Sequence, residues 1–142
     1  MSFANPPDNE IRAFLSKPTT VAVVGCSDNP NRDSLEIAML LKRKGFHVIP
    51  VNPQLAPEAL RAELGERCYP DLVSIPDHVE IVDVFRRSEF LPAITEAAIK
   101  KGARILWGQL GVVHLEAAAR AREAGMTVVM DRCPAIEYRR LF

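Results

Sequence analysis

The strongest constraint on the fold is an alternation of short apolar runs with longer segments of helical spacing. The runs are rich in β-branched side chains, which is typical of strands that are buried on both faces of a parallel sheet. They are Thr20 to Val24, Phe46 to Val51, Ile81 to Phe85, Arg104 to Trp107 and Met126 to Met130. The pattern therefore predicts five parallel strands joined by helices.

The segments between these runs carry helix signals, with apolar residues three and four apart and a glycine after several of them. The expected helices are Ser34 to Lys44, Ser88 to Lys101 and Val112 to Ala124, with weaker ones at Asp8 to Ser16 and Pro57 to Leu64. Right-handed crossovers then predict an α/β, Rossmann-like, doubly wound parallel sheet with strand order 3-2-1-4-5. We expect residues 1–142 to form a single domain, with a core at about 20–131 and short helical extensions at both ends.

The charge balance argues against several classes of partner. Eighteen basic and eighteen acidic side chains cancel to a net charge of zero, which gives no general attraction for nucleic acid or an anionic membrane. The apolar runs are too short to cross a bilayer, and the first residues lack the basic and apolar regions of a leader peptide. Three widely spaced cysteines fit a reducing compartment. We therefore expect a cytoplasmic protein that binds neither nucleic acid nor membrane.

The carboxyl ends of parallel strands share one edge of the sheet, where such folds bind ligands. Gly25, Cys26 and Ser27 follow the first run and precede a helix, so we expect the backbone N–H groups of Gly25 and Ser27 to face a phosphate. A nicotinamide-dinucleotide fingerprint would place glycines where Ser27 and Pro30 stand, and an acid where Asn52 stands. The sequence thus predicts a phosphate site and disfavours NAD.

Three arginines are expected near that edge. Arg32 lies in the first loop, and Arg86 and Arg87 directly follow the third run. The planar guanidinium group matches a phosphate oxyanion, although Arg32 could instead pair with Asp28 or Asp33 at the surface. We predict that these arginines supply the positive charge of the phosphate site.

Five motifs resemble, in order, those of the small stand-alone CoA-binding proteins, which are relatives of the CoA-binding domain of succinyl-CoA synthetase. They are VAVVGCSDNPNRDS, VIPVNP, IVDVFRR, LWGQLGV and VVMDRCP, and the resemblance runs from about Val21 to Leu141. It implies a Rossmann-like fold that holds coenzyme A (CoA) at the carboxyl edge of the sheet. The residues implied to contact CoA are Gly25, Cys26 and Ser27 under the phosphates, Arg32 and Ser34 beside them, Asn52 and Pro53 at the adenosine, and Phe85, Arg86, Arg87, Trp107 and Gln109 along the rest of the groove.

We therefore expect non-catalytic binding of CoA or an acyl-CoA, which the protein would sense or carry, without a metal. CoA carries a pyrophosphate and a separate ribose phosphate, so it needs more positive charge than NAD and no ribose-binding acid. One alternative is an oxidoreductase or redox sensor that uses NAD(P) in the same crevice. Another is a thiol enzyme or regulator that uses Cys26 or Cys133. Asp83, inside the third run, is expected to be a hydrogen-bonded structural residue.

Overall fold

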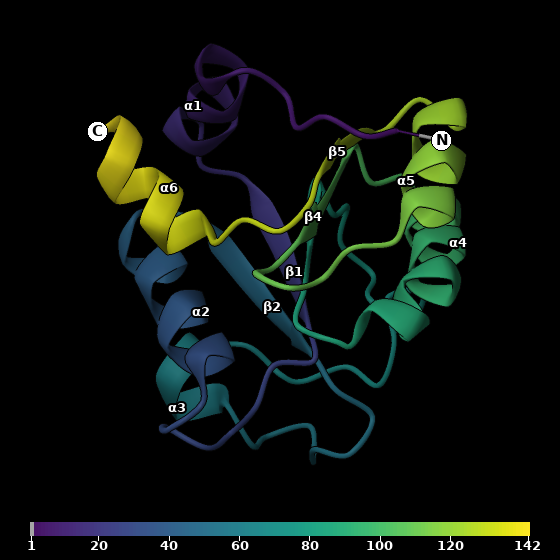
Figure 1. The fold of residues 1–142 in the computed structure, drawn as a ribbon. Helices are drawn as coiled ribbons and strands as arrows, with labels where there is room; N and C mark the ends of the chain where they lie inside the picture. Colours follow the sequence, from purple (N-terminus) through teal and green to yellow (C-terminus); the bar gives the residue numbers. More distant parts are fainter. Residues whose placement is uncertain (1) are drawn as a thin grey trace.

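The computed structural model describes residues 2–142 and places five parallel strands in one sheet between two layers of helices (Figure 1). The strands are β1 (Thr20–Val24), β2 (His47–Val51), β3 (Ile81–Val84), β4 (Ile105–Gly108) and β5 (Thr127–Val129). Each lies inside or within one residue of an apolar run of the sequence. The chain is a single α/β domain with the expected Rossmann-like fold.

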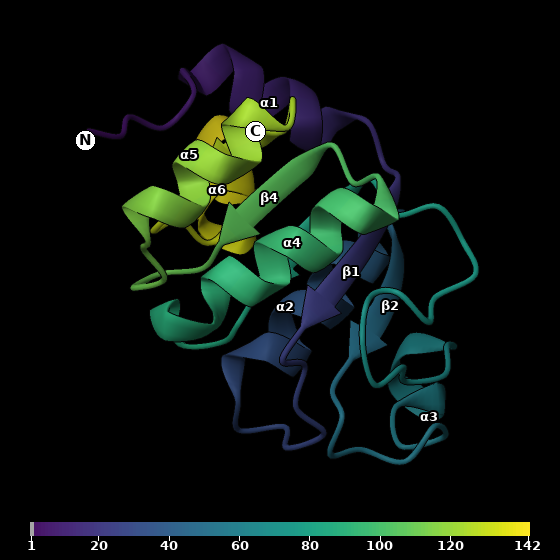
Figure 2. The same ribbon diagram turned by 90° about the vertical axis from the view of Figure 1, so that its right-hand side faces the viewer.

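Helices cover both faces of the sheet. α4 (Leu91–Lys101) and α5 (Leu115–Glu123) lie side by side on one face, in front of the sheet in Figure 2. The other face is covered by α1 (Asp8–Ser16), α2 (Asp33–Arg43) and α6 (Pro134–Leu141), and the short α3 (Arg61–Leu64) lies beside α2 and β2. Within the described residues, no helix has the length and the apolar composition that crossing a membrane requires.

The strand order is β2-β1-β3-β4-β5, so the predicted order 3-2-1-4-5 is wrong. The reason lies in Pro50, in the middle of β2, which has no N–H to donate to a ladder and is tolerated at a sheet edge. Its carbonyl oxygen faces outward and accepts from the backbone N–H of Tyr69 at 3.0 Å. β2 is therefore an edge strand, and β3 pairs with the other side of β1. The reversal of strand order still lies beside β1, as expected.

Three helices begin later than the sequence predicts: α4 and α5 by three residues each, and α3, which begins at Arg61 instead of Pro57. The segment that leads into α4 forms a 3-10 turn, η1 (Ser88–Phe90), and the α-helix begins only at Leu91. In the second case the ring Nδ1 of His114 accepts from the backbone N–H of Ala117 at 3.1 Å. This hydrogen bond caps α5, so the preceding residues form a loop at the carboxyl edge of the sheet.

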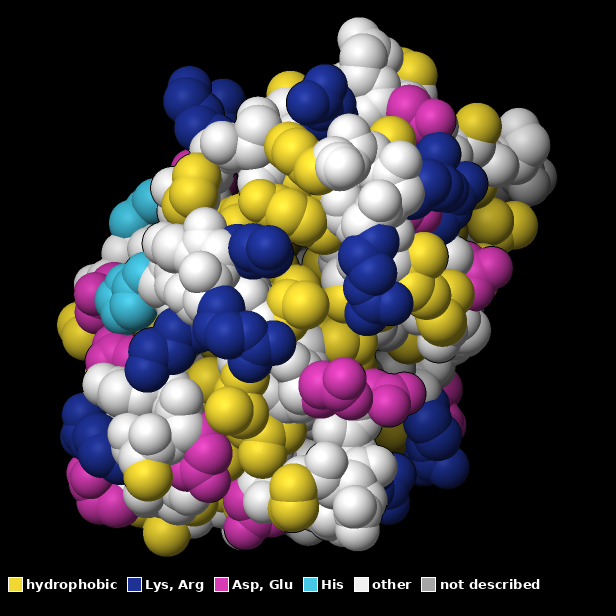
Figure 3. Space-filling view, turned by 90° about the vertical axis from the view of Figure 1, so that its left-hand side faces the viewer, with side chains coloured by type: hydrophobic (Ala, Val, Ile, Leu, Met, Phe, Trp, Pro, Cys, Tyr) yellow, Lys and Arg dark blue, Asp and Glu magenta, His cyan; other side chains and the backbone are white. Residues whose placement is uncertain are grey.

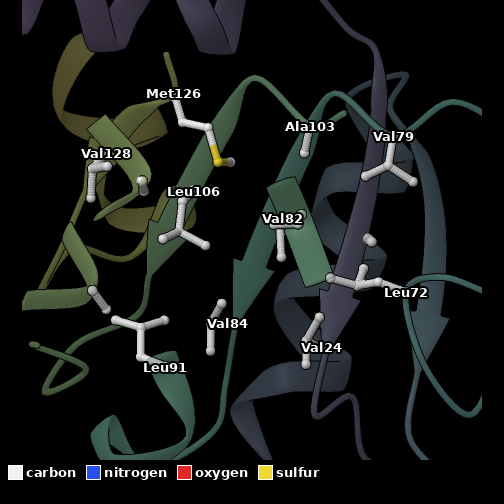
Figure 4. Close-up of a cluster of buried hydrophobic side chains, with 14 of the residues drawn as sticks. Val24, Leu72, Val79, Val82, Val84, Leu91, Ala103, Leu106, Met126 and Val128 are labelled. Atoms are coloured by element: carbon white, nitrogen blue, oxygen red, sulfur yellow. The ribbon is translucent and has the colours of Figure 1, made fainter. Parts of the chain in front are cut away.

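Alternating side chains of each strand build two separate cores. Ala22 and Val24 of β1 join Val82 and Val84 of β3 under α4 and α5, and Figure 4 shows part of this cluster. Val21 and Val23 face the opposite side, under α1, α2 and α6. The sheet is buried on both faces, which is why its strands appear as continuous apolar runs in the sequence.

Asp83 interrupts the second core. Its side chain is 1% exposed, and neither carboxylate oxygen has a hydrogen-bond partner within residues 2–142. The prediction that Asp83 is hydrogen-bonded is therefore wrong. Burial raises the pKa of this carboxyl group well above its ordinary value, so the folded protein keeps this proton to a higher pH than the unfolded chain does.

Candidate functional site

The loop after β1 is shaped by Gly25, which has a φ of +87°. A Cβ atom at this position would lie 3.0 Å from both Cδ of Arg86 and the carbonyl oxygen of Phe85. Any other residue would be strained and would also displace the segment after β3. The glycine thus lets the side chain of Arg86 pack directly over the end of β1.

Side chains of the loop bind its own backbone. Ser34 Oγ accepts from the N–H of Ser27 at 3.0 Å, and Ser27 Oγ accepts from the N–H of Asn29 at 3.0 Å. The N–H of Gly25 donates to the carbonyl oxygen of Val51 at 2.8 Å. The two backbone donors that the sequence assigned to a phosphate are therefore both used within the protein.

The N-terminus of α2 supplies another set of donors. Arg32 is the N-cap residue, and no side chain of the described chain caps this end of the helix. The first-turn N–H groups of α2 and the positive end of the helix dipole are thus available to an anion.

A cavity of about 470 Å³ lies against this helix end, and we call it the loop cavity. Its lining includes Ser27, Arg32, Ser34 and Phe85. Arg32 forms no ion pair among residues 2–142, so the alternative pairing with Asp28 or Asp33 is not formed. Its guanidinium group is free to bind an anion here.

A second cavity, of about 220 Å³, lies between the ends of β1 and β2 and helix α4, and we call it the α4 cavity. Pro53, Leu72 and Ile94 give it apolar walls. The guanidinium carbon of Arg86 lies 4.3 Å from the centroid of the Phe90 ring, so this cavity also has a cation held on an aromatic face. Apolar walls beside a guanidinium group can accept an aromatic ring.

A third cavity, of about 330 Å³, lies between α2 and α6, and we call it the α2–α6 cavity. Its walls are largely apolar, with Ile37, Leu110 and Ile136 among them. Gln109, only 6% exposed, also lines it, and the Oε1 atom of this side chain is buried with no partner among the described residues. A buried amide oxygen without a hydrogen-bond partner is costly to the folded protein.

The three cavities share lining residues. Gly25 borders both the loop cavity and the α4 cavity, whereas Asp33 and Phe85 border both the loop cavity and the α2–α6 cavity. The three cavities therefore adjoin one another along the carboxyl edge of the sheet, from the α4 face to the α2 face, and we call them together the groove. Gly25, Ser27, Arg32, Ser34, Pro53, Phe85, Arg86 and Gln109 all border it.

Four other residues of the predicted site lie elsewhere. Cys26 is completely buried, and Trp107 is 1% exposed with its Nε1 donating to the carbonyl oxygen of Arg132 at 2.9 Å. Asn52 Nδ2 donates to the carbonyl oxygen of Cys26 at 3.0 Å, so this side chain holds the backbone of the loop after β1 in place. Arg87 points outward, with a 79% exposed side chain that pairs with Glu89 at 3.0 Å.

Burial raises the pKa of the Cys26 thiol to about 12, and nearby Cys68 and Asp83 add to the rise. A thiol with such a pKa is neutral at physiological pH, so Cys26 is unsuited to act as a nucleophile. Cys133 lines the α2–α6 cavity and is 5% exposed.

Sequence reasoning missed the residues that wall the groove from the helices. Ile37 and Leu40 come from α2, Phe90 comes from η1, Ile94 comes from the first turn of α4, and Ile136 comes from α6. Their apolar character was visible, but an apolar residue at a helix end contacts either the sheet or a ligand. Only the relative placement of the helices distinguishes the two.

A cavity larger than these three lies at the opposite, amino edge of the sheet. It has a volume of about 620 Å³ and is bordered by Thr19, Glu80 and Arg104. Glu80 and Arg104 pair with each other there at 3.3 Å. Parallel sheets bind ligands at the carboxyl edge, where helix N-termini and Gly25 lie, so we assign the site to the groove despite its smaller cavities.

Comparison with known proteins identifies the family of this chain. An uncharacterised Bacillus subtilis protein, YneT, is 40% identical over 129 residues, which are 91% of this chain and 92% of that protein. The solved structure of a hypothetical protein from Pyrococcus horikoshii has a TM-score of 0.88 and 36% identity, with 99% of each chain covered. An ADP-forming acetate–CoA ligase II of Archaeoglobus fulgidus is 30% identical over 63% of this chain, which spans only 13% of that ligase. A family model described as CoA binding domain matches residues 19–139, and the chain therefore belongs to this family.

Proposed function

We propose that the protein binds CoA or an acyl-CoA along the groove. It does not itself catalyse a reaction on this ligand, and it senses or carries it. The observation that carries the proposal is the division of the groove into three parts that suit the three parts of CoA. Membership of the CoA binding domain family supports the choice of ligand.

The phosphates fit the loop cavity. Arg32 and the uncapped N-terminus of α2 both present positive charge there. A pyrophosphate at the N-terminus of a helix is stabilised by the helix dipole and by the free N–H groups of the first turn. Asp33 is exposed at the same helix end and is the one lining group that opposes an anion.

The adenine fits the α4 cavity. Its walls are apolar, and Arg86 lies over Phe90 at the side of the cavity next to Gly25. A guanidinium group in this place can stack on the base or bind the ribose phosphate.

The pantetheine arm fits the α2–α6 cavity. The arm contains two amide groups, and the buried amide of Gln109 lacks a partner for its Oε1 atom. If the Gln109 side chain turns toward the cavity, an amide N–H of the ligand satisfies this oxygen and removes an energetic cost that the free protein carries.

Titration calorimetry tests the proposal with CoA, dephospho-CoA and adenosine 3′,5′-bisphosphate as ligands. Replacement of Arg32 or Arg86 by alanine should weaken CoA binding by about tenfold, because each removes a charge-assisted contact. Arg87→Ala is the matched control, since the side chain of Arg87 points outward. Gln109→Leu should weaken binding of CoA and leave that of the bisphosphate, which has no arm, unchanged. Equal affinities of all four variants and the unmodified protein for CoA would reject the site.

A further inference from the structure

The α2–α6 cavity opens through two exposed apolar side chains. Leu110 is 58% exposed and Ile136 is 46% exposed, and both border the cavity. Large apolar side chains with this much exposure are few in the described chain, and two of them meet at this mouth. Figure 3 shows the face formed by α1, α2 and α6, where hydrophobic side chains emerge between groups of Lys and Arg.

The cavity runs along α2. Asp33, Ile37 and Leu40 all line it and recur on one face of the helix, so it extends about 10 Å from the N-terminus of α2 at 1.5 Å per residue. The end at Asp33 is continuous with the loop cavity, and the end at Leu40 is not. An extended chain that leaves the loop cavity would follow α2, pass Gln109 and reach Leu40 and Ile136.

The charged groups around this cavity disfavour an acidic ligand. The carboxylates of Asp33 and Glu36 line it from α2, and Arg139 lines it from α6. Both acidic side chains are exposed at the rim, so the local balance is one negative charge. An uncharged chain would bury apolar surface without meeting this repulsion.

From these observations we propose that Leu110 and Ile136, at the mouth of the α2–α6 cavity and beyond the part that the pantetheine arm fills, bind the acyl chain of an aliphatic acyl-CoA. The protein then prefers longer uncharged acyl groups to acetyl-CoA, to free CoA and to acyl groups that end in a carboxylate. This proposal rests on the proposed function, because it requires the phosphates to lie in the loop cavity.

The test is calorimetry with CoA and its acetyl, butyryl, hexanoyl, octanoyl and succinyl thioesters. Each fully buried methylene strengthens binding by up to about fourfold. With partial burial, hexanoyl-CoA should bind at least about tenfold more tightly than acetyl-CoA. Butyryl-CoA should bind more tightly than succinyl-CoA, which has the same number of acyl carbons and a terminal carboxylate.

Substitutions at the mouth of the α2–α6 cavity give a second readout. It is the affinity for octanoyl-CoA divided by the affinity for acetyl-CoA. Leu110→Ser and Ile136→Ser, alone and together, should reduce this ratio. Val113→Ser is the matched control, because Val113 is 43% exposed in the same loop and does not border the cavity. The control should retain the full ratio.

The outcomes separate this proposal from the proposed function. If no CoA compound binds, the proposed function fails. If CoA binds but affinity does not rise with chain length, or if Val113→Ser lowers the ratio as much as Leu110→Ser, only the acyl site is rejected. Tighter binding of succinyl-CoA than of butyryl-CoA would also overturn it and would point to Arg139 as a carboxylate ligand.

Discussion

Asp83 gives a quantitative prediction, because its carboxyl group is buried without a partner. Burial raises its pKa, so the folded protein keeps this proton at pH values where the unfolded chain has released it. The contribution of this proton to the free energy of unfolding is fully present below the pKa of the unfolded chain, which is about 3.9. This contribution is lost progressively as the pH rises toward the pKa of the folded state. Asp83→Asn retains the shape of the side chain and removes this dependence.

The size of the effect follows from proton linkage. One proton bound by the folded state and absent from the unfolded state changes the free energy of unfolding by about 1.4 kcal/mol per pH unit. The stability of Asp83→Asn relative to the unmodified protein should therefore rise by about this amount per unit from about pH 4.5 upward. In thermal unfolding the corresponding change is about 3 to 6 °C per pH unit.

Urea unfolding at pH 4.5, 5.5 and 6.5, followed by the fluorescence of the single tryptophan, measures this difference. The slope with pH is the readout, so a constant loss of stability caused by the asparagine itself does not obscure it. Asp77→Asn, at an exposed carboxylate, controls for the removal of one charge. A stability difference that is the same at all three pH values would refute the claim that Asp83 is protonated in the core.

Three further substitutions test the loop after β1. Gly25→Ala should destabilise the protein by at least about 2 kcal/mol, since it combines a positive φ with a Cβ 3.0 Å from two neighbours; an unchanged unfolding midpoint would contradict this. Ser34→Ala should cost about 1 to 2 kcal/mol in chemical unfolding, because it leaves the N–H of Ser27 without its acceptor. Cys26→Ala should bind CoA within about twofold of the unmodified protein in calorimetry, because the thiol lies beneath the groove and the polar groups of the loop are intact. CoA that is released only by a reductant would instead support a thiol regulator.

The sequence was sufficient to predict the strands and the class of fold, because residues buried on both faces leave a continuous apolar run. The strand order was wrong although a signal was present. Pro50 excludes β2 from the interior of a sheet, and the order 3-2-1-4-5 would have required it there. At this position a single proline decides the strand order.

The sequence predicts where the candidate site lies in the fold. It does not predict which backbone groups and side chains of the site face a ligand. Gly25 and Arg86 lie at the carboxyl edge because the strands end there, and that follows from the pattern alone. Whether an N–H faces a ligand depends on local hydrogen bonds, and Ser34 takes up the donor of Ser27. Adjacent residues also diverge, since Arg86 borders the α4 cavity whereas Arg87 faces outward.

The central claim is that the groove binds CoA, and thermal unfolding against a panel of ligands tests it most directly. The panel contains CoA, acetyl-CoA, dephospho-CoA, NAD, NADH, NADPH and ATP. A ligand at one hundred times its dissociation constant stabilises the folded state by about 2.7 kcal/mol, which raises the midpoint by about 5 to 10 °C for a chain of this size. CoA or acetyl-CoA should give the largest shift. A shift with NADH or NADPH and none with CoA would contradict the claim and favour an oxidoreductase that uses the same edge of the sheet.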